Sequence, residues 1–458
     1  MSGYDAALAA IERLEAFGIR LGLENVRAWC EASDHPERAA PVAHVAGTNG
    51  KGTTAACLDA IARGHGLSVG RYTSPHIIDF RERILVDGRP IEGGRVAALW
   101  DRIRGFVEER QMTYFESATL IAFERFREAG VDLAIHEVGM GGRLDATNVV
   151  DPEVALVTNV ARDHEAHLGE SPAEIAREKA GIFAPGRPAL VGDPGPPEVR
   201  AIFEDVATEV GAVLEFVSDE VKWSVTSMNP SATGFDYVSP ERSLQALAVP
   251  AAGEHFAADA ALAVRAFERL GAAGAAPPIE EDALREALAG VALPGRMEVY
   301  RTDGVEVVLD AAHNPAAIGR LAATLRGIDL HPCAVVVGIL SDKRWETMLD
   351  ALEPVAAMAW LCELASASAG RRLTEPKAAR PVAARPWVAW ADSVAVGLRE
   401  ARAMVEAGEA TRIVVTGSFY TVGEALLALD LAAAGRPYPG SGPTRSGAPG
   451  EPVGAGSR

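Results

Sequence analysis

The chain has 458 residues and a formal net charge of −19, from 44 basic and 63 acidic residues. This length is too great for one ordinary core and predicts two or at most three domains, each with a sizeable interior. The acidic charge excludes nucleic acid and anionic membranes as expected partners, because both would be repelled. Any polyanion would have to bind in a local basic pocket.

The other bulk features predict a cytoplasmic protein, and we expect a monomer. Acidic residues at positions 5, 12 and 15 interrupt the first helical pattern, which leaves no room for the apolar region of a signal peptide. No uncharged apolar run approaches the roughly 18 residues of a membrane span. The cysteines form no CxxC pair and are predicted to be buried free thiols: Cys30, Cys57, Cys333 and Cys362.

In chain order, the first part of the sequence alternates helical and strand patterns. Helices are expected over residues 4–17, 53–63, 117–129 and 172–180, and strands over 41–46, 67–72, 133–138 and 154–160. This alternation predicts a mainly parallel, doubly wound α/β sheet, whose functional loops lie at the carboxyl ends of the strands.

A glycine-rich turn, HVAGTNGKGTT at 44–54, joins the first strand to the second helix. Its three glycines allow the backbone to wrap around an anion, so that N–H groups and the positive end of the helix point at phosphate oxygens. Lys51 would supply a mobile charge for the outer phosphates, and Thr53 or Thr54 a hydroxyl for magnesium. The strict pattern GxxxxGK[ST] is not met, because a valine replaces the first glycine and a glycine separates the lysine from the threonine. An ordinary loop is therefore the alternative.

The later part of the chain predicts a second α/β unit. Residues 186–197, rich in Pro and Gly, are expected to form a surface connection, and 223–249 a few antiparallel strands. Helices over 255–270 and 280–288 precede LPGR at 293–296, which we interpret as the domain junction. Beyond it, strands are expected over 305–311, 334–339, 358–362 and 411–416, and helices over 315–326, 345–352, 393–406 and 422–434.

These patterns predict two domains and a tail. Residues 1–295 would form an N-terminal domain with a P-loop-type, mainly parallel sheet, and residues 296–436 a smaller, Rossmann-like α/β domain. From position 435 the composition shifts to Gly, Pro and Ser. Such a segment buries too little apolar surface to offset its chain entropy, so residues 437–458 are expected to be disordered.

Polar clusters fall at the ends of predicted strands and helices. They are YTSPH at 72–76, Glu137 before a glycine-rich turn, Asp163-His164, and Glu178-Lys179. Each has a simple structural alternative, such as a turn, a capping carboxylate or a lysine that complements a helix dipole. Taken together, a hydroxyl, a carboxylate and an imidazole on neighbouring loops favour ligands for a cation beside a triphosphate.

The motifs as a set resemble those of folylpolyglutamate synthase and of its bifunctional bacterial form, dihydrofolate synthase, in the Mur-ligase superfamily. They are GTNGKGT at 47–53, YTSPH at 72–76, HEVGMGGRLDATN at 136–148, DHEAHLG at 163–169, EKAGIF at 178–183, PGRME at 294–298, LDAAHNP at 309–315 and TGSFY at 416–420. The resemblance runs, in order and without large gaps, from about residue 5 to residue 433.

The resemblance implies an ATP- and Mg²⁺-dependent ligase that adds L-glutamate to the carboxylate of dihydropteroate or of a reduced folate. In that chemistry the carboxylate attacks the γ-phosphate to give an acyl phosphate and ADP, and the glutamate amine then displaces phosphate. Lys51 and magnesium would neutralise the charge that develops between the β and γ phosphates. Lys179 matches a lysine that carbon dioxide converts into a carbamate. That reaction needs an unprotonated amine, which burial favours.

The resemblance also implies roles for individual residues. The catalytic residues would be Lys179, His313 and Lys51, and magnesium would be held by Ser74, Glu137, His164 and Thr53. The nucleotide would contact Asn49, Gly50, Lys51, Gly52, Thr53, Thr54, Asp259, Arg296 and Asp310. The pterin substrate would contact Thr113, Leu144, Asp145, Ala146 and, more loosely, Glu24 and Asn25. For the last two, capping of a helix is the alternative.

The sequence departs from the family pattern at several places. The usual HQ with a later Asn is replaced by His255-Phe256 and Asp259, and a carboxylate cannot donate a hydrogen bond as an amide does. Ala311, Arg344 and Ala184 replace a usual glycine, acidic residue and lysine. None of these changes removes a predicted metal ligand, so we expect an active enzyme.

Two alternative functions are open at this point. Another Mur-type amide ligase, such as a cell-wall ligase, would share the phosphate-binding turn, although GTNGKGT and YTSPH favour the folate ligases. A nucleotide-binding protein without ligase activity is the other alternative, which the change at Asp259 slightly favours.

Overall fold

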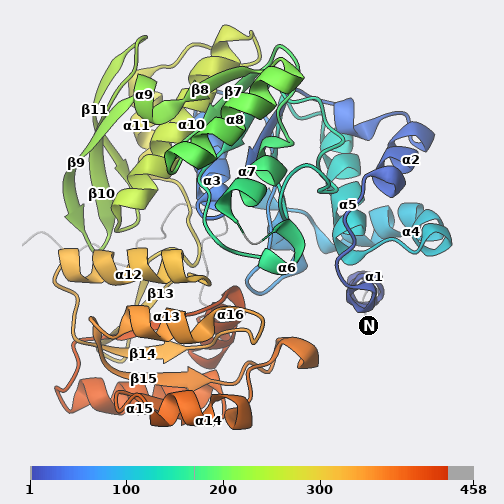
Figure 1. Cartoon of the computed structure of the whole chain (residues 1–458). Helices are drawn as coiled ribbons and strands as arrows, with labels where there is room; N and C mark the ends of the chain where they lie inside the picture. Colours follow the sequence, from blue (N-terminus) through green and yellow to red (C-terminus); the bar gives the residue numbers. More distant parts are fainter. Residues whose placement is uncertain (1–2, 170, 432–458) are drawn as a thin grey trace, which may run out of the picture.

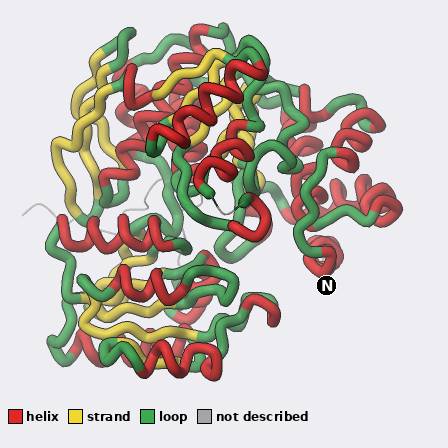
Figure 2. The backbone as a smooth tube through the Cα atoms, viewed as in Figure 1, coloured by secondary structure: helices red, strands yellow, loops and turns green. Residues whose placement is uncertain are grey.

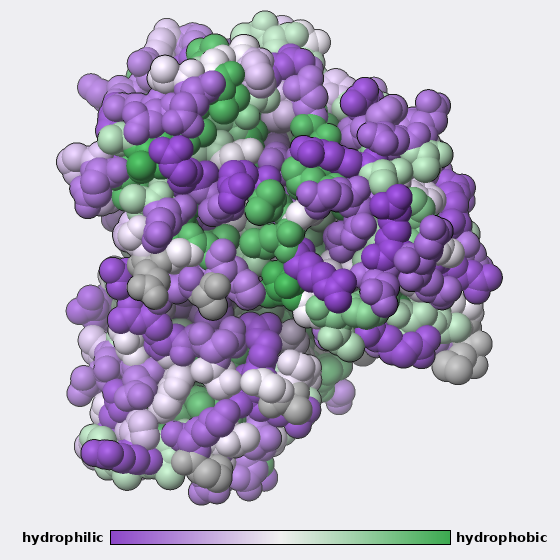
Figure 3. Space-filling view, turned by 45° about the vertical axis from the view of Figure 1, so that its right-hand side comes forward, coloured by the Kyte–Doolittle hydropathy of each residue, from purple (hydrophilic) through white to green (hydrophobic). Residues whose placement is uncertain are grey.

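The computed structural model describes residues 3–169 and 171–431, and the predicted tail lies outside them. The chain forms an N-terminal body, coloured blue to yellow in Figure 1, and a C-terminal body in orange and red beneath it. The strands belong to three sheets covered by helices (Figure 2). Most of the visible surface is hydrophilic, and hydrophobic residues gather where the two bodies meet (Figure 3). Within the described ranges, no helix has the length and apolar character needed to cross a membrane.

The N-terminal body is built on an eight-stranded sheet. Its strands are β1 (Val42–Ala46), β2 (Val69–Tyr72), β3 (Ile84–Val86), β4 (Arg89–Pro90), β5 (Leu133–Glu137), β6 (Val154–Val157), β7 (Pro188–Val191) and β8 (Val213–Phe216). They lie in the order β4-β3-β2-β5-β1-β6-β7-β8. β3 pairs antiparallel with both of its neighbours, β2 and β4, and the other pairs of neighbouring strands are parallel. The chain leaves β1 for one side of the sheet and later returns to the other, so the end of β1 is a topological switch point, where ligands of such folds bind.

The helices of this body cover both faces of the sheet. They are α1 (Gly3–Arg13), α2 (Glu24–Ala32), α3 (Lys51–Gly64), α4 (Gly93–Arg110), α5 (Tyr114–Ala129), α6 (Glu165–Leu168), α7 (Pro172–Ala180), α8 (Pro197–Val210), α9 (Val217–Glu220), α10 (Glu254–Ala272) and α11 (Glu281–Ala289), with 3₁₀ turns η1 (Leu14–Phe17), η2 (Pro36–Arg38) and η3 (Phe80–Arg83). Val45 of β1 packs with α3 and α10, whereas Val42 packs with α4 and α5. Burial on both faces explains why the parallel strands read as continuous apolar runs.

A three-stranded antiparallel sheet packs on α10, which confirms the strands predicted over 223–249. It consists of β9 (Lys222–Asn229), β10 (Ala232–Val238) and β11 (Ser243–Val249), in the order β11-β10-β9.

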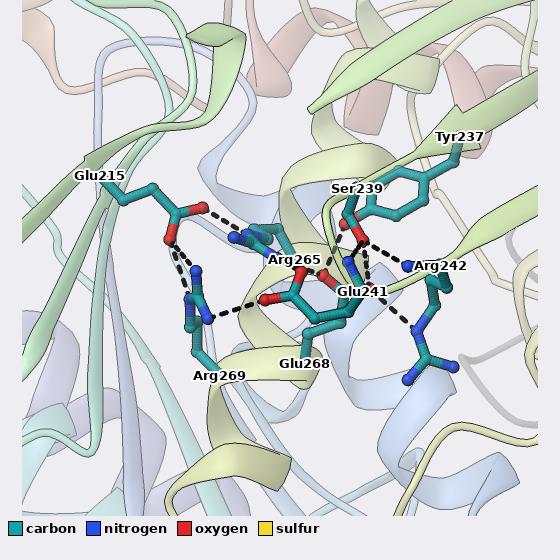
Figure 4. Close-up of polar contacts among 8 residues, drawn as sticks. All are labelled: Glu215, Tyr237, Ser239, Glu241, Arg242, Arg265, Glu268 and Arg269. Atoms are coloured by element: carbon teal, nitrogen blue, oxygen red, sulfur yellow. Dashed lines mark hydrogen bonds and ion pairs between the residues drawn. The ribbon is translucent and has the colours of Figure 1, made fainter. Parts of the chain in front are cut away.

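Arg265 of α10 ties this sheet to the body through a buried ion network (Figure 4). Its side chain is 0% exposed and pairs with carboxylates from β8, from the turn before β11 and from α10 itself: Glu215, Glu241 and Glu268. Burial opposes the charge, but these hydrogen bonds hold the pKa of Arg265 above its ordinary value. Tyr237 and Ser239 donate to Glu268 at 2.9 and 3.0 Å, so the network also reaches β10.

The C-terminal body holds a six-stranded sheet. Its strands are β12 (Glu298–Thr302), β13 (Val305–Leu309), β14 (Cys333–Val337), β15 (Ala356–Cys362), β16 (Val388–Ala391) and β17 (Ile413–Thr416), in the order β12-β13-β17-β14-β15-β16, with β12 antiparallel. Its helices are α12 (Pro315–Gly327), α13 (Trp345–Leu352), α14 (Glu375–Ala383), α15 (Val394–Glu406) and α16 (Phe419–Ala428), with the 3₁₀ turn η4 (Ala369–Arg371). α12 faces the N-terminal body (Figure 1), and Gly327 at its end lies against Met228 of β9.

The prediction of a surface connection over 186–197 is wrong, because part of this segment is a core strand. The last three residues of β7 are fully buried between β6 and β8. Proline is tolerated at the first position of a strand, so the apolar run after Pro188 is a strand signal that the surrounding Pro and Gly residues hide. The sequence patterns also miss the short strands β3, β4, β8, β12 and β16. The four cysteines are buried and free, as predicted.

Candidate functional site

The turn between β1 and α3 requires glycine at two positions. Gly47 has φ +143°, and a Cβ there would lie 1.8 Å from Oγ1 of Thr158. Gly50 is the N-cap of α3 with φ +87°, a conformation that side chains other than glycine rarely adopt. Because the first N–H groups of a helix have no partner within it, this turn presents donors and a positive dipole end to an anion.

Polar residues that follow β6 hold the turn in place. Thr158 Oγ1 and Asn159 Nδ2 donate to the carbonyl of Asn49 at 2.6 and 2.8 Å, and Asn159 Oδ1 accepts from the Asn49 N–H at 3.1 Å. Lys51 Nζ donates to the carbonyl of Thr48 at 3.2 Å. The turn is thus organised in advance of any ligand. Thr158 and Asn159 are missing from the sequence prediction, although their place directly after a buried strand is a signal for them.

Glu137 and Ser74 meet beside the start of α3. Glu137 ends β5, next to β1, and its Oε2 accepts from the Ser74 N–H at 3.0 Å. A Cβ on Gly52 would lie 3.6 Å from that oxygen. Burial raises the pKa of Glu137, and the charges of Lys51, Arg296 and Arg71 oppose this rise. An open pocket between the two bodies is lined by residues that include Gly52, Thr53, Arg71, Ser74, Glu137, Arg296 and Phe419.

His164 lies in a second cluster close to the turn. It has φ +54°, an uncommon conformation for this residue type, and caps the short helix α6. Burial, followed by the charge of Lys343, lowers the pKa of His164 to about 3. The imidazole is therefore neutral, which is the state that binds metals.

Asp163 connects this cluster to the C-terminal body. It forms an ion pair with Lys343, accepts from Asn314 Nδ2 at 3.3 Å and lies 3.6 Å from Nε2 of His313. Burial opposes its ionisation, but Lys343 and the neighbouring histidines hold the pKa of Asp163 below its ordinary range. Asn314 Nδ2 also donates to Asn49 Oδ1 at 2.9 Å. The C-terminal body therefore touches the glycine-rich turn directly.

Lys179, at the end of α7, points at the same turn. Its Nζ donates to the carbonyl of Gly47 at 2.9 Å, and the residue is 3% exposed. Burial, with the nearby charge of Lys51, lowers the pKa of Lys179 to about 7. A substantial fraction of this amine is therefore unprotonated at neutral pH.

Three of the predicted nucleotide residues lie on the two bodies and on the segment that joins them. Arg296 stacks on the ring of Phe419, with its guanidinium carbon 4.9 Å from the ring centre. Asp310 is buried, and its two oxygens accept from the N–H groups of Met297 and Ala312, each at 3.0 Å. Asp259 of α10 lies against Gly50, on the other side of the turn.

Residues 45–267 match the Mur ligase middle domain, and residues 295–419 match the Mur ligase glutamate ligase domain. The dihydrofolate synthase/folylpolyglutamate synthase of Escherichia coli K12 is 34% identical over 431 residues, which cover 92% of this chain and 94% of that protein. The chain belongs to the folylpolyglutamate synthase/dihydrofolate synthase family of Mur ligases.

Other members of this family cover the chain similarly. A probable bifunctional folylpolyglutamate synthase/dihydropteroate synthase of Haloferax volcanii is 34% identical over 92% of this chain, which spans 50% of the length of that protein. A crystal structure of a bifunctional folylpolyglutamate synthase/dihydrofolate synthase with Mn, AMPPNP and L-glutamate bound has a TM-score of 0.80 at 33% identity and covers 93% of this chain and 98% of its own. These matches confirm the predicted family and the α/β fold class.

Two of the predicted pterin-contacting residues, Asn25 and Thr113, meet at a residue that the sequence analysis missed. Glu116 of α5 accepts from Asn25 Nδ2 at 3.1 Å and from Thr113 Oγ1 at 2.8 Å. Thr113 is also the N-cap of α5. The capping interpretation of Glu24 and Asn25 is wrong, because Leu23 is the N-cap of α2 and no side chain caps that helix.

The turn over 144–146 lies next to the same region. The carbonyl of Leu144 accepts from the Gly22 N–H at 3.2 Å. Asp145 is buried and accepts from the Met140 N–H at 2.9 Å and from Thr147 Oγ1 at 2.6 Å, while Ala146 packs in the core near α5. The fold thus gathers segments that are far apart in the sequence.

The residues around Glu137 fit a magnesium ion bound jointly with phosphates. Within residues 3–169 and 171–431, no group of three or more His, Cys, Asp or Glu side chains forms a metal cage. Magnesium characteristically uses one or two carboxylates, with phosphate and water oxygens as its other ligands. One buried carboxylate beside two hydroxyl-bearing residues and a glycine-rich turn with free N–H groups suits that requirement.

Proposed function

We propose that this chain is an ATP-dependent ligase that adds L-glutamate to the carboxylate of dihydropteroate, of a reduced folate, or of both. The observation that carries this proposal is the meeting, at the end of β1, of the glycine turn, Glu137, Lys179 and the second domain's Asn314. The E. coli relative has both activities in its name, and the similar crystal structure holds a nucleotide analogue and L-glutamate. These names favour a folate ligase over another Mur-type ligase and over a binding protein without activity.

The turn and its surroundings bind Mg-ATP. Backbone N–H groups over 49–54 and the Lys51 amine hold the phosphates, with Asp259 beside them against Gly50, and Arg296 and Asp310 hold the rest of the nucleotide. Thr53, Ser74, Glu137 and His164 hold magnesium, which neutralises negative charge on the phosphates when bound. The 3.0 Å contact between Ser74 and Glu137, and the neutral state of His164, support this assignment. His313 faces the acyl group from the second domain.

Lys179 supplies a further anionic ligand after reaction with carbon dioxide. The amine lone pair bonds to the carbon, a proton leaves the nitrogen, and a carbamate with two oxygens results. The near-neutral pKa of Lys179 and its exposed fraction of only 3% support this reaction, because burial favours the unprotonated amine. The carbamate would bind a second magnesium ion.

Ligase activity is tested directly with purified full-length protein, ATP, magnesium and L-glutamate. We expect ADP release that depends on both glutamate and a pterin acid, measured with dihydropteroate and with tetrahydrofolate in parallel. Comparing the two rates also shows which ligation the chain performs. Absence of glutamate-dependent ADP release with every pteroate and folate would instead support a binding protein without ligase activity.

The pterin side of the site is tested at Glu116, which holds Asn25 and Thr113. Replacing Glu116 with alanine is expected to raise the KM for the pterin acid by about tenfold or more, with the KM for ATP little changed, because one well-placed anchor contributes at least about 1.4 kcal/mol. Glu128→Ala is the control, because Glu128 lies near the other end of the same helix, where its carboxylate pairs with Arg102 and contacts neither Asn25 nor Thr113. A fall in melting temperature with no change in KM would assign Glu116 a purely structural role.

A further inference from the structure

Asp259 is a buried carboxylate that faces the phosphate-binding turn. The residue is 7% exposed. A Cβ built on Gly50 would lie 2.3 Å from its Oδ1 and 2.6 Å from its Oδ2, so the whole carboxylate packs against that glycine. Among the described residues, none donates a hydrogen bond to Asp259 or forms an ion pair with it. Neither oxygen is among the fully buried polar atoms that lack a partner, so solvent still reaches the carboxylate at the turn.

The charges around Asp259 do not compensate for its burial. Arg320 of α12 and Arg296 of the junction favour the ionised form, but burial outweighs both and raises the pKa of Asp259 to about 7. His255, on the same helix, is half-buried, and desolvation lowers its pKa to about 3, so it carries no charge at neutral pH. Beneath Asp259, Cys57 of α3 is a neutral thiol, because burial and the charge of Asp259 raise its pKa.

A triphosphate bound on the turn would bring further negative charge close to this carboxylate. Two like charges a few ångströms apart disfavour ionisation and raise the pKa of the weaker acid. Phosphates remain ionised near neutral pH, so the proton goes to Asp259. When Asp259 is protonated, it also has an O–H group, which can donate a hydrogen bond to an anionic ligand.

We propose that Asp259 takes up a proton when the nucleotide binds, so that the triphosphate is held beside a neutral carboxylic acid. This inference rests on the proposed function, because it assumes that the turn over 47–54 binds ATP. It goes further by making nucleotide affinity depend on pH through one residue. Below its pKa Asp259 is protonated with or without nucleotide, and affinity does not depend on it. Above pH 7 the free protein loses the proton that the complex retains, and affinity falls.

The experiment is calorimetric titration of the full-length protein with AMPPNP and magnesium between pH 6.5 and 9. Wild-type protein is expected to take up close to one proton per site at pH 8.5, measured from the heat in buffers of different ionisation enthalpy. Lys179, with a pKa of about 7, titrates in the same range, so the diagnostic quantity is the difference between wild type and Asp259→Asn. That variant keeps the shape of the side chain but has no ionisable proton.

At pH 8.5 Asp259→Asn is expected to bind AMPPNP about 30-fold more tightly than wild type. The reason is that the affinity of the wild-type protein falls by about a factor of ten for each pH unit above the pKa of Asp259. At pH 6.5 the two proteins are expected to bind equally. Glu254→Gln is the matched control, because it removes a carboxylate from the exposed first turn of the same helix and should bind as wild type does throughout.

Equal proton uptake by wild type and Asp259→Asn, or equal affinity at pH 8.5, would overturn the inference while leaving nucleotide binding intact. Failure of all three proteins to bind AMPPNP at any pH would overturn the proposed function itself. The proton count of the wild-type protein in different buffers tests the inference even without the variant.

Discussion

Replacing Lys179 with alanine is expected to lower the rate of ADP release by at least about 100-fold, the size of effect seen when one preorganised electrostatic group is removed from an active site. The side chain is buried at the turn, with its Nζ 2.9 Å from the carbonyl of Gly47, and its pKa of about 7 makes it available to carbon dioxide. ATP binding should be little changed, because the backbone of the turn and Lys51 hold the phosphates. The measurements are the steady-state rate and the affinity for AMPPNP.

Two further measurements test whether Lys179 acts as a carbamate or only as a positive charge. Added bicarbonate should not restore activity to Lys179→Ala, since no amine remains to react. Arg177→Ala is the control, because Arg177 is on the same helix but is exposed and paired with the exposed Glu209. At saturating ATP the wild-type rate should rise through about pH 7 as the lysine loses its proton. Full activity of the alanine variant would remove Lys179 from the mechanism.

Replacing Arg265 with methionine is expected to reduce the free energy of unfolding by about 3–5 kcal/mol, as is typical when one partner of a buried ion network is removed. The change leaves Glu215, Glu241 and Glu268 with a net excess of negative charge inside the protein. Because Arg265 joins α10 to β8 and to the three-stranded sheet, the loss should appear in the cooperative unfolding of the N-terminal body. Urea denaturation followed by circular dichroism measures it.

Arg301→Met is the matched control for this prediction. Arg301 is 72% exposed and pairs with Glu306 at 2.7 Å across β12 and β13. Exposed ion pairs contribute at most about 1 kcal/mol, so the control should unfold almost as wild type does. Equal stability of the two variants would mean that the network around Arg265 does not hold the sheet to the body.

Several features of the candidate site could be predicted from the sequence. Some involve only residues that are close together in the chain, and others follow from the rule that functional loops lie at the carboxyl ends of parallel strands. The positive φ angles of Gly47 and Gly50 belong to a single turn, so the spacing of the glycines indicates it. Ser74 and Glu137 each follow a strand, and the carboxyl ends of parallel strands share one edge of the sheet. Their meeting beside α3 is therefore expected once the strands are recognised.

Other features depend on which elements become neighbours. The Asn49–Asn314 contact and the Asp163–Lys343 ion pair join the two bodies, and no pattern around either residue indicates its partner. Glu116 reads as an ordinary polar residue at the start of a helix, yet it holds Asn25 and Thr113 together. β7 was hidden because its flanking Pro and Gly residues carry a turn signal stronger than three apolar residues.

The sequence by itself determined the family, the alternation of strands and helices, and the glycine turn. Each of these is recognised from the types of residues that lie close together in the sequence. Tertiary structure alone decided that Asp259 lies against Gly50 without a partner and that Arg265 is enclosed by three carboxylates. The physical reason is that burial and the charges of distant neighbours set the protonation of these groups, and both are established only when the chain has folded.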